Sequence, residues 1–278
     1  MLGVRHVAVL VAAAALVVSA PGAAGTRDVS TARIAENVRN LAALGPRVPG
    51  SGAERRGTEL AAAALRESGF RVLRQQVPLP RGGVSHNAVG LGEGPIRFVV
   101  VAHVDTVRGS PGANDNASGV AALLEAARVL GPRPGTAFAV VGAEERAETG
   151  ARVHLGSQRF VRGVSPAARR VAYGVALDMV GVGGALHVRG IEAQPNRSAR
   201  LLLREARRLG VRATYLRDSG ISDHADLTRA GLPAAWLQWR EDACWHRPCD
   251  RAQRVDPRKV AVVVRIVVAA ASRASSGP

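Results

Sequence analysis

The sequence predicts one α/β domain in which helices cover both faces of a layered sheet. Segments with helical apolar spacing alternate with short apolar runs along the chain. Several of these runs are continuous, which is typical of strands buried on both faces. The chain has 278 residues, 47% of them hydrophobic, with no internal repeat or long low-complexity linker. These features favour a single large core.

Apolar spacing and end signals predict the order of the elements. Three of the expected helices end at glycines, namely Gly69, Gly131 followed by Pro132, and Gly210. The expected helices cover 31–44, 54–68, 116–130, 151–162, 197–209 and 256–272. The apolar runs predict strands near 71–79, 86–92, 97–102, 136–142, 171–177, 183–188, 211–215 and 233–239.

The formal net charge of +16 does not by itself indicate a nucleic-acid partner. Aromatic residues make up only 3% of the chain, too few for a surface that stacks bases. Lys259 is the only lysine, and the arginines are scattered through the expected helices. We therefore favour a basic surface of biased composition over a nucleic-acid-binding patch, and expect no nucleic-acid partner.

The N-terminus has the pattern of a secretory signal peptide. Arg5 and His6 precede an apolar run over 7–18 and small residues over 19–25. We expect residues 1–24 to be removed, residues 25–272 to form the domain, and residues 273–278 to be a flexible tail; an uncleaved anchor is the alternative. The apolar run over 260–271 is interrupted by Arg265. We expect a secreted or extracytoplasmic protein without a stable membrane anchor.

Acidic and histidine residues follow the expected strands, where ligands of α/β sheets bind. Each could singly be a loop residue or a helix cap, but adjacent buried carboxylates repel each other and need a cation or a shared proton. The candidates are His103, Asp105, Asp115, Glu144, Glu145, Asp178 and His246. Two histidines and three carboxylates suit zinc, and a carboxylate can bridge two metals about 3.5–4 Å apart. Asp105 is placed to orient the imidazole of His103.

Together these residues resemble the secreted bacterial di-zinc aminopeptidases, which share a peptidase fold with glutaminyl cyclases. The matching segments are Leu44-Gly-Pro-Arg-Val-Pro-Gly-Ser51, His103-Val-Asp105, Gly112-Ala-Asn-Asp-Asn-Ala-Ser-Gly119, Glu144-Glu145, Asp178-Met-Val-Gly181, Ser222-Asp-His224 and Trp245-His-Arg-Pro-Cys-Asp250. The resemblance implies a three-layer zinc-peptidase fold with a mixed, mostly parallel central sheet. It covers most of the chain after the signal segment.

The resemblance also implies roles for these residues. One zinc would be held by His103, Asp115 and Asp178, and a second by Asp115, Glu145 and His246. Glu144 would be the general base. Cys244 and Cys249 flank His246 and resemble a disulfide found there in some relatives; in an oxidising compartment they are free to pair.

Two departures limit what the resemblance implies. A longer segment, 146–155, separates the glutamate pair from Gly156, so its conformation is not predictable. Ile221 stands where some relatives have an arginine that binds the main chain of the substrate. Asp223 and His224 are expected to line the substrate pocket, with direct zinc ligation as the alternative. The histidines expected to be structural or exposed are His86, His154 and His187.

The sequence thus predicts an exported zinc-dependent aminopeptidase, with two zinc ions and peptides with a free N-terminus as substrates. We expect a monomer and a preference for a hydrophobic N-terminal residue. Three alternatives remain: a single-zinc glutaminyl cyclase, a zinc carboxypeptidase or deacylase of another di-metal clan, and a non-catalytic exported binding protein on the same fold. The last belongs to a different functional class.

Overall fold

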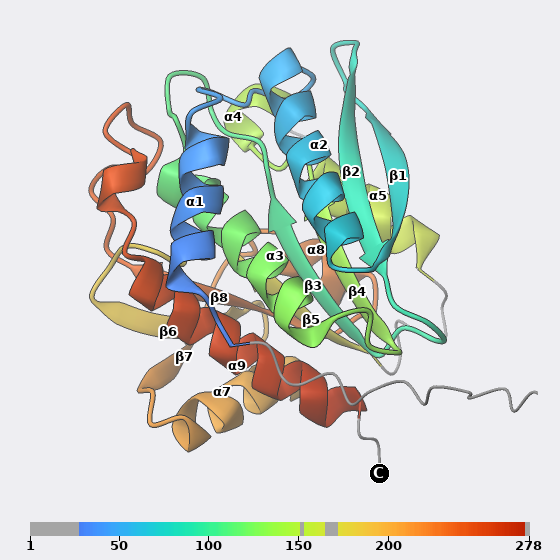
Figure 1. Cartoon of the computed structure of the whole chain (residues 1–278), viewed down its shortest axis with the longest axis vertical. Coiled ribbons are helices and arrows are strands. Elements are labelled where there is room, and N and C mark those ends of the chain that lie inside the picture. Colours follow the sequence, from blue (N-terminus) through green and yellow to red (C-terminus); the bar gives the residue numbers. More distant parts are fainter. Residues whose placement is uncertain (1–27, 151–152, 165–171, 276–278) are drawn as a thin grey trace, which may run out of the picture.

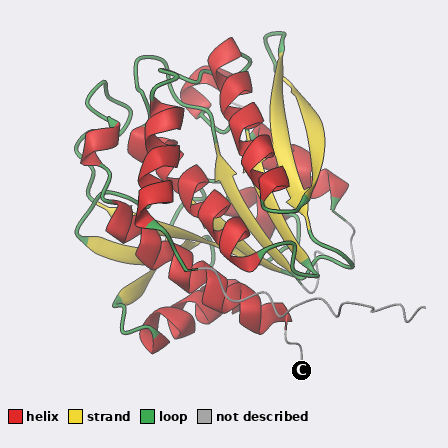
Figure 2. Cartoon of the chain, in the orientation of Figure 1, coloured by secondary structure: helices red, strands yellow, loops and turns green. Residues whose placement is uncertain are grey.

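Eight strands form one mixed sheet in the computed structural model, which describes residues 28–150, 153–164 and 172–275 (Figures 1 and 2). The expected signal peptide lies outside the described residues. The strands are β1 (Arg71–Pro78), β2 (Val84–Leu91), β3 (Phe98–His103), β4 (Thr136–Val141), β5 (Tyr173–Leu177), β6 (Ala185–Gly190), β7 (Ala213–Arg217) and β8 (Ala234–Arg240). Their order across the sheet is β1-β2-β4-β3-β5-β8-β6-β7.

The four central strands run in the same direction. β4, β3, β5 and β8 pair in parallel, whereas β1, β2 and β6 join the sheet through antiparallel pairs. The carboxyl ends of the four parallel strands therefore meet at one edge. This edge is where a layered α/β sheet places its ligand site.

Helices cover the sheet on both faces, as the sequence predicts. On one face the core includes side chains of α1 (Thr31–Ala42), α2 (Gly52–Glu67), α3 (Gly119–Leu130), α7 (Arg197–Arg208) and α9 (Pro257–Ser275). On the other face it includes side chains of α5 (Leu155–Gly163) and α8 (His224–Arg229). Figure 1 shows α1, α2, α3 and α9 in front of the sheet. None of the described helices combines the length and apolar character needed to cross a membrane.

The strand β3 shows why its sequence is apolar throughout. Phe98, Val100 and Ala102 point into the core beneath the first helix layer, and Val99 and Val101 into the core beneath the second. A strand buried on both faces cannot alternate apolar with polar residues. The expected three-layer α/β fold with a mixed, mostly parallel sheet is confirmed.

The differences from the predicted elements concern short segments. The helix expected over 151–162 begins at Leu155, preceded by His154 in a left-handed conformation with φ of 53°. The short helices α4 (Arg146–Thr149) and α8 were not predicted, because one or two turns carry too little periodicity. The helix α9 extends to Ser275, so the expected flexible tail over 273–278 is helical in its first three residues. Residues 276–278 lie outside the described residues.

Candidate metal centre

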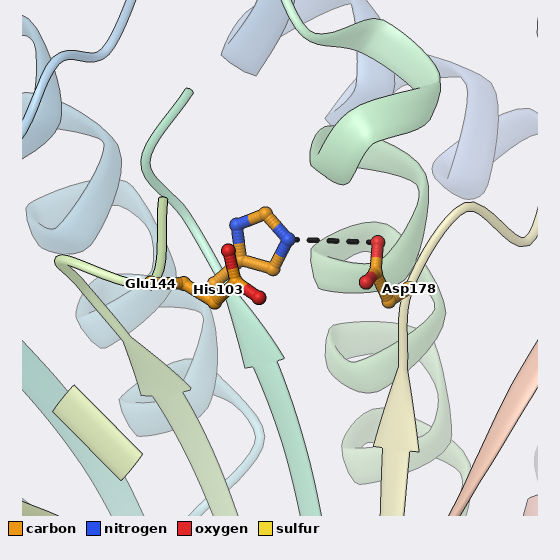
Figure 3. Close-up of side chains that lie close together, drawn as sticks. All are labelled: His103, Glu144 and Asp178. Atoms are coloured by element: carbon orange, nitrogen blue, oxygen red, sulfur yellow. Dashed lines mark ion pairs between the residues drawn. The ribbon is translucent and has the colours of Figure 1, made fainter. Parts of the chain in front are cut away.

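Three strand ends bring the predicted metal ligands together. His103 is the last residue of β3, the pair Glu144 and Glu145 follows β4, and Asp178 follows β5 directly. Figure 3 shows the side chains of His103, Glu144 and Asp178 converging above the strands. All of these side chains are buried, so the sheet fixes their positions.

The distances divide the cluster into two groups that share Asp115. His103 Nε2 lies 3.4 Å from Asp115 Oδ1 and 3.5 Å from Asp178 Oδ1. His246 Nε2 lies 3.2 Å from Asp115 Oδ2 and 3.1 Å from Glu145 Oε2. The carboxylate of Asp115 thus faces one histidine with each oxygen, which is the arrangement of a bridging carboxylate.

The donor set fits zinc. Ligand atoms around tetrahedral zinc, at about 2.0–2.1 Å from the metal, are separated by roughly 3.3 Å, close to the separations of the two groups. Asp178 Oδ1 and Glu145 Oε1 are buried and have no hydrogen-bond partner among the described residues, so each has a lone pair to offer. The Nδ1 of His103 lies 3.2 Å from the carbonyl oxygen of Asp105. A hydrogen bond there leaves Nε2 as the ligand atom.

Glu144 lies close enough to this cluster to serve either as a base or as a ligand. Two triplets among the described residues have ligand atoms within 4.8 Å of one another: His103 with Glu144 and Asp178, and His103 with Asp115 and Glu145. The geometry therefore places Glu144 beside the candidate metal position.

The carboxyl groups of this cluster are buried, and burial disfavours their charged forms. Burial raises the pKa of Glu145 to about 7, with a further increase from the charge of Asp115. The pKa of Glu144 is raised well above its usual value, again mainly by burial. Burial lowers the pKa of His246, but hydrogen bonds to Asp115 and Glu145 outweigh this effect and raise it to about 10. A bound cation would compensate the same charges.

The segment that carries Asp115 is held from two sides. The π turn η1 (Ala113–Ser118) has a cis peptide bond between Asp115 and Asn116. The backbone N–H groups of Asn114 and Asp115 donate to the carboxylate of Asp250, at 2.7 and 3.0 Å. On the other side, Asn116 Nδ2 donates to the carbonyl of Leu177 at 2.8 Å. A Cβ at Gly119 would lie 2.2 Å from that carbonyl oxygen, so this close approach requires glycine.

Arg47 explains part of the Leu44–Ser51 motif. Its side chain is fully buried, and burial lowers its pKa to about 10. The guanidinium donates to the carbonyls of Val104, Pro111 and Gly112 at 2.7 to 2.8 Å. These carbonyls lie in the segments that follow β3 and precede Asp115. Arg47 therefore fixes one segment of the site relative to the other.

Asp105 does more than face His103. Its carboxylate accepts hydrogen bonds from the backbone N–H groups of Glu144, at 3.0 and 3.1 Å, and of Glu145, at 3.0 Å. Its Oδ1 lies 3.7 Å from His103 Nδ1, farther away than its own carbonyl oxygen. The Asp105 side chain thus mainly holds the backbone of the glutamate pair.

His246 comes from a loop, in contrast to the strand-end ligands. Cys244 and Cys249 form a disulfide on either side of it, which confirms the predicted pairing. His246 has a φ of 59°, and its ring packs against that of Trp245 with the ring centroids 4.3 Å apart. Asp250, which holds the Asp115 segment, directly follows the disulfide.

The Ser222-Asp223-His224 segment contacts the candidate metal centre through Ser222. Ser222 Oγ donates to Asp178 Oδ2 at 2.9 Å, leaving Oδ1 toward His103. His224 is fully buried, with Nε2 3.1 Å from Asp218 Oδ2. Asp223 and His224, which we expected along the substrate pocket, are not among the residues that line the cavity over the metal centre.

That cavity has a volume of about 620 Å³, large enough for a short peptide segment. The candidate ligands and Glu144 form its floor. Its walls carry apolar side chains and three arginines: Met179, Ile221, Trp236, Trp245, Arg146, Arg189 and Arg240. The guanidinium of Arg189 lies 4.1 Å above the ring of Trp236.

Sequence reasoning missed four residues that hold the site. Arg47 and Asp250 lay inside quoted motifs but carried no recognisable chemical signal. His154, which was expected to be structural or exposed and to have no part in the site, is buried against Glu144 in the segment 146–155. Asp226 lies beside His154, 72 residues further along the chain. Only the folded chain brings this last pair together.

Comparison with known proteins agrees with this geometry. The family model described as Peptidase family M28 matches residues 89–271. Aminopeptidase YwaD of Bacillus subtilis (strain 168) is 31% identical over 185 residues, which are 62% of this chain and 39% of that protein. The uncharacterised protein YfbL of Escherichia coli (strain K12) is 36% identical over 133 residues, 41% of this chain and 38% of that protein. This chain thus spans about two fifths of the length of both relatives.

Solved structures share the whole fold at lower sequence identity. An aminopeptidase from Aneurinibacillus sp. strain AM-1 superposes with a TM-score of 0.79 at 19% identity, over 90% of this chain and 95% of the other. A glutaminyl cyclase from Bacteroides thetaiotaomicron, bound to N-acetylhistamine, gives a TM-score of 0.75 at 21% identity, over 88% and 98% of the two chains. The same architecture therefore occurs in two kinds of enzyme.

Proposed function

The chain belongs to peptidase family M28, and we propose that it is an exported zinc-dependent aminopeptidase. It would hydrolyse the N-terminal peptide bond of peptides with a free N-terminus. The proposal rests on two clusters of side chains, each with one histidine, that share the carboxylate of Asp115. Glu144 lies beside them, and these residues line a cavity.

The proposed ligands divide between two zinc ions. His103, Asp115 and Asp178 would hold one ion, and Asp115, Glu145 and His246 the other. Bound zinc supplies Lewis acidity, which lowers the pKa of water and polarises a carbonyl oxygen.

Glu144 is the proposed general base. It accepts a proton from the attacking water and returns it to the leaving amine. Asp105 fixes the backbone on which Glu144 stands. Burial raises the pKa of the Glu144 carboxyl group, which favours its uptake of a proton from water.

The test combines metal analysis with a substrate series. Purified protein should contain two zinc ions per chain and release the first residue from unblocked dipeptides and tripeptides, whereas N-acetylated versions should be left intact. A chelator should abolish the release, and added zinc should restore it. Active protein that holds no metal and is insensitive to chelators would contradict the proposal.

The same assay separates the alternatives. A glutaminyl cyclase would convert peptides with N-terminal glutamine to pyroglutamyl peptides and release no amino acid. A carboxypeptidase or deacylase would accept the N-blocked peptides. A binding protein would hold peptides without changing them. Sequencing the mature N-terminus of protein secreted by the native host tests export.

A further inference from the structure

A buried histidine contacts the proposed base Glu144. His154 Nε2 lies 3.3 Å from Glu144 Oε1, the separation of an ion pair, and both residues line the cavity. The His154 side chain is 4% exposed and that of Glu144 8% exposed, so water competes little for this contact. None of the roles proposed above involves His154.

The other nitrogen of His154 is fixed by a carboxylate. His154 Nδ1 lies 2.5 Å from Asp226 Oδ2, and the second oxygen of Asp226 accepts a hydrogen bond from Gln158 Nε2 at 3.2 Å. A carboxylate beside Nδ1 places a proton on that nitrogen and sets the plane of the ring. Nε2 is then the atom that faces Glu144.

The backbone holds His154 in a conformation that needs support. Its φ of 53° is uncommon for a residue other than glycine. The N–H of His154 donates to the carbonyl of Glu144 at 3.1 Å, and that of Leu155 to the carbonyl of Ala143 at 2.9 Å. The segment that carries His154 is thus bonded directly to the residues that follow β4. Local strain of this kind is concentrated at functional sites.

We propose that His154 is a positioning residue for Glu144. Braced by Asp226, its imidazole holds the Glu144 carboxyl group toward His103 and Asp178, in the orientation that proton transfer requires. His154 touches neither the candidate metal ligands nor the substrate in this role; it acts through Glu144. The proposal rests on the aminopeptidase function proposed above.

Two substitutions of His154 test the contacts of its two ring nitrogens separately. In His154→Asn the side-chain amide can take the place of Nδ1 and keep the bond to Asp226, but it does not reach Glu144. In His154→Gln the longer side chain can reach Glu144 but loses Asp226. Asparagine also tolerates a positive φ better than glutamine does.

Activity and stability should therefore rank the two variants in opposite order. The kcat of His154→Asn should fall about 10- to 100-fold, the usual effect of removing a residue that orients an active-site group, with KM and zinc content unchanged. His154→Gln should keep a higher kcat than His154→Asn but melt at a lower temperature. A purely structural role for His154 would give the same order in both measurements.

A double substitution tests whether the effect passes through Glu144. In a Glu144→Gln background, His154→Asn should lower the residual kcat by much less than it does in the native enzyme. His86→Asn is the matched control, because His86 lies on β2 and does not line the cavity; it should leave kcat unchanged.

The outcomes distinguish this inference from the proposed function. Zinc-loaded native protein that releases no amino acid from any unblocked peptide would contradict the aminopeptidase proposal itself. Active native protein would overturn only the inference if the kcat of His154→Asn equalled that of the native enzyme, if kcat followed melting temperature, or if the two substitutions had independent effects.

Discussion

The two halves of the candidate metal centre are positioned by different means. His103 and Asp178 stand at the ends of neighbouring parallel strands, and their side chains are 1% and 9% exposed. His246 stands on a loop, and its side chain is 33% exposed. The ladder of β3 and β5 fixes the first pair. The loop depends on side-chain braces: the disulfide, and Asp242 Oδ1, which accepts from the N–H of Cys244 at 2.9 Å.

This difference shows where each half is vulnerable. A strand-end ligand keeps its place as long as the sheet is intact, so a substitution there removes a ligand and little else. A loop ligand can be lost while its own side chain is intact, because the braces around it can be cut. Asp115 belongs to both halves, since its two oxygens face the two histidines.

Replacing the shared ligand should have the largest effect. We expect Asp115→Ala to lower zinc content at both positions and to reduce kcat/KM by about 10³-fold or more, because stabilisation of several kcal/mol from the metals is lost. Asp178→Ala is the control, because Asp178 belongs to one proposed ligand set only, and it should mainly weaken the binding of one zinc ion. Metal analysis after dialysis at limiting zinc measures both. Normal retention of two zinc ions by Asp115→Ala would disprove the bridge.

Replacing the base should remove the chemistry and leave both halves in place. Glu144→Gln changes little volume, so we expect zinc content near that of the native enzyme and a kcat lower by about 10²–10⁴-fold, the usual contribution of a general base. Zinc analysis and steady-state kinetics on one preparation make the comparison. If Glu144→Gln kept most of its turnover, another residue would be the base. If it lost zinc, Glu144 would be a metal ligand.

The same division explains what could be predicted from the sequence. The strands β3, β4 and β5 are continuous apolar runs, and the polar residues after them had to meet at one edge of a parallel sheet. The positions of His103, Glu144 and Asp178 therefore followed from the pattern. The fold class followed from the alternation of such runs with helices.

The contacts that His154 and Arg47 make with distant segments could not be predicted in this way. The contact between His154 and Asp226 joins residues 72 positions apart in the sequence, and the spacing of apolar residues within a segment does not show which distant segment it contacts. The fully buried Arg47 appeared in the sequence as one arginine among many, because only the fold shows that it bonds to carbonyls of distant loops. Such interactions depend on the relative positions of loops, which no local pattern encodes.

Weakening the hydrogen bonds between Asp250 and the segment that carries Asp115 should have an intermediate effect on activity. In Asp250→Asn one carboxylate oxygen that accepts a backbone N–H becomes an amide that donates. We expect kcat/KM to fall about 10- to 100-fold, in the range typical for residues that orient metal ligands, with a lower affinity for zinc. Asp256→Asn is the control, because the Asp256 side chain accepts from the nearby N–H of Arg258, and the bond from Asp256 to the carbonyl of Gly181 uses the backbone N–H, which the substitution leaves in place. Equal activity of the two variants would show that Asp250 does not position Asp115.

The smallest effect should come from opening the disulfide. Cys249→Ser leaves every proposed ligand in place and removes only a cross-link over a sequence separation of 5 residues. In the chain-entropy model so short a loop contributes about 2 kcal/mol to the free energy of unfolding. We therefore expect a melting temperature only a few degrees lower in the metal-free protein.

The affinity for zinc should respond more strongly than the melting temperature. Without the cross-link, His246 must adopt its positive φ and its place beside Asp115 at the expense of loop entropy. We expect the zinc held by the loop half to bind about tenfold more weakly, while the zinc held by His103 and Asp178 is unaffected. Competition with a chromophoric chelator resolves the two affinities, and Cys244→Ser, which opens the same bridge from its other end, should reproduce the result. Equal weakening of both zinc ions would mean that the loop and strand halves are not independent. Freely alkylated thiols in active native protein would show that the disulfide does not form.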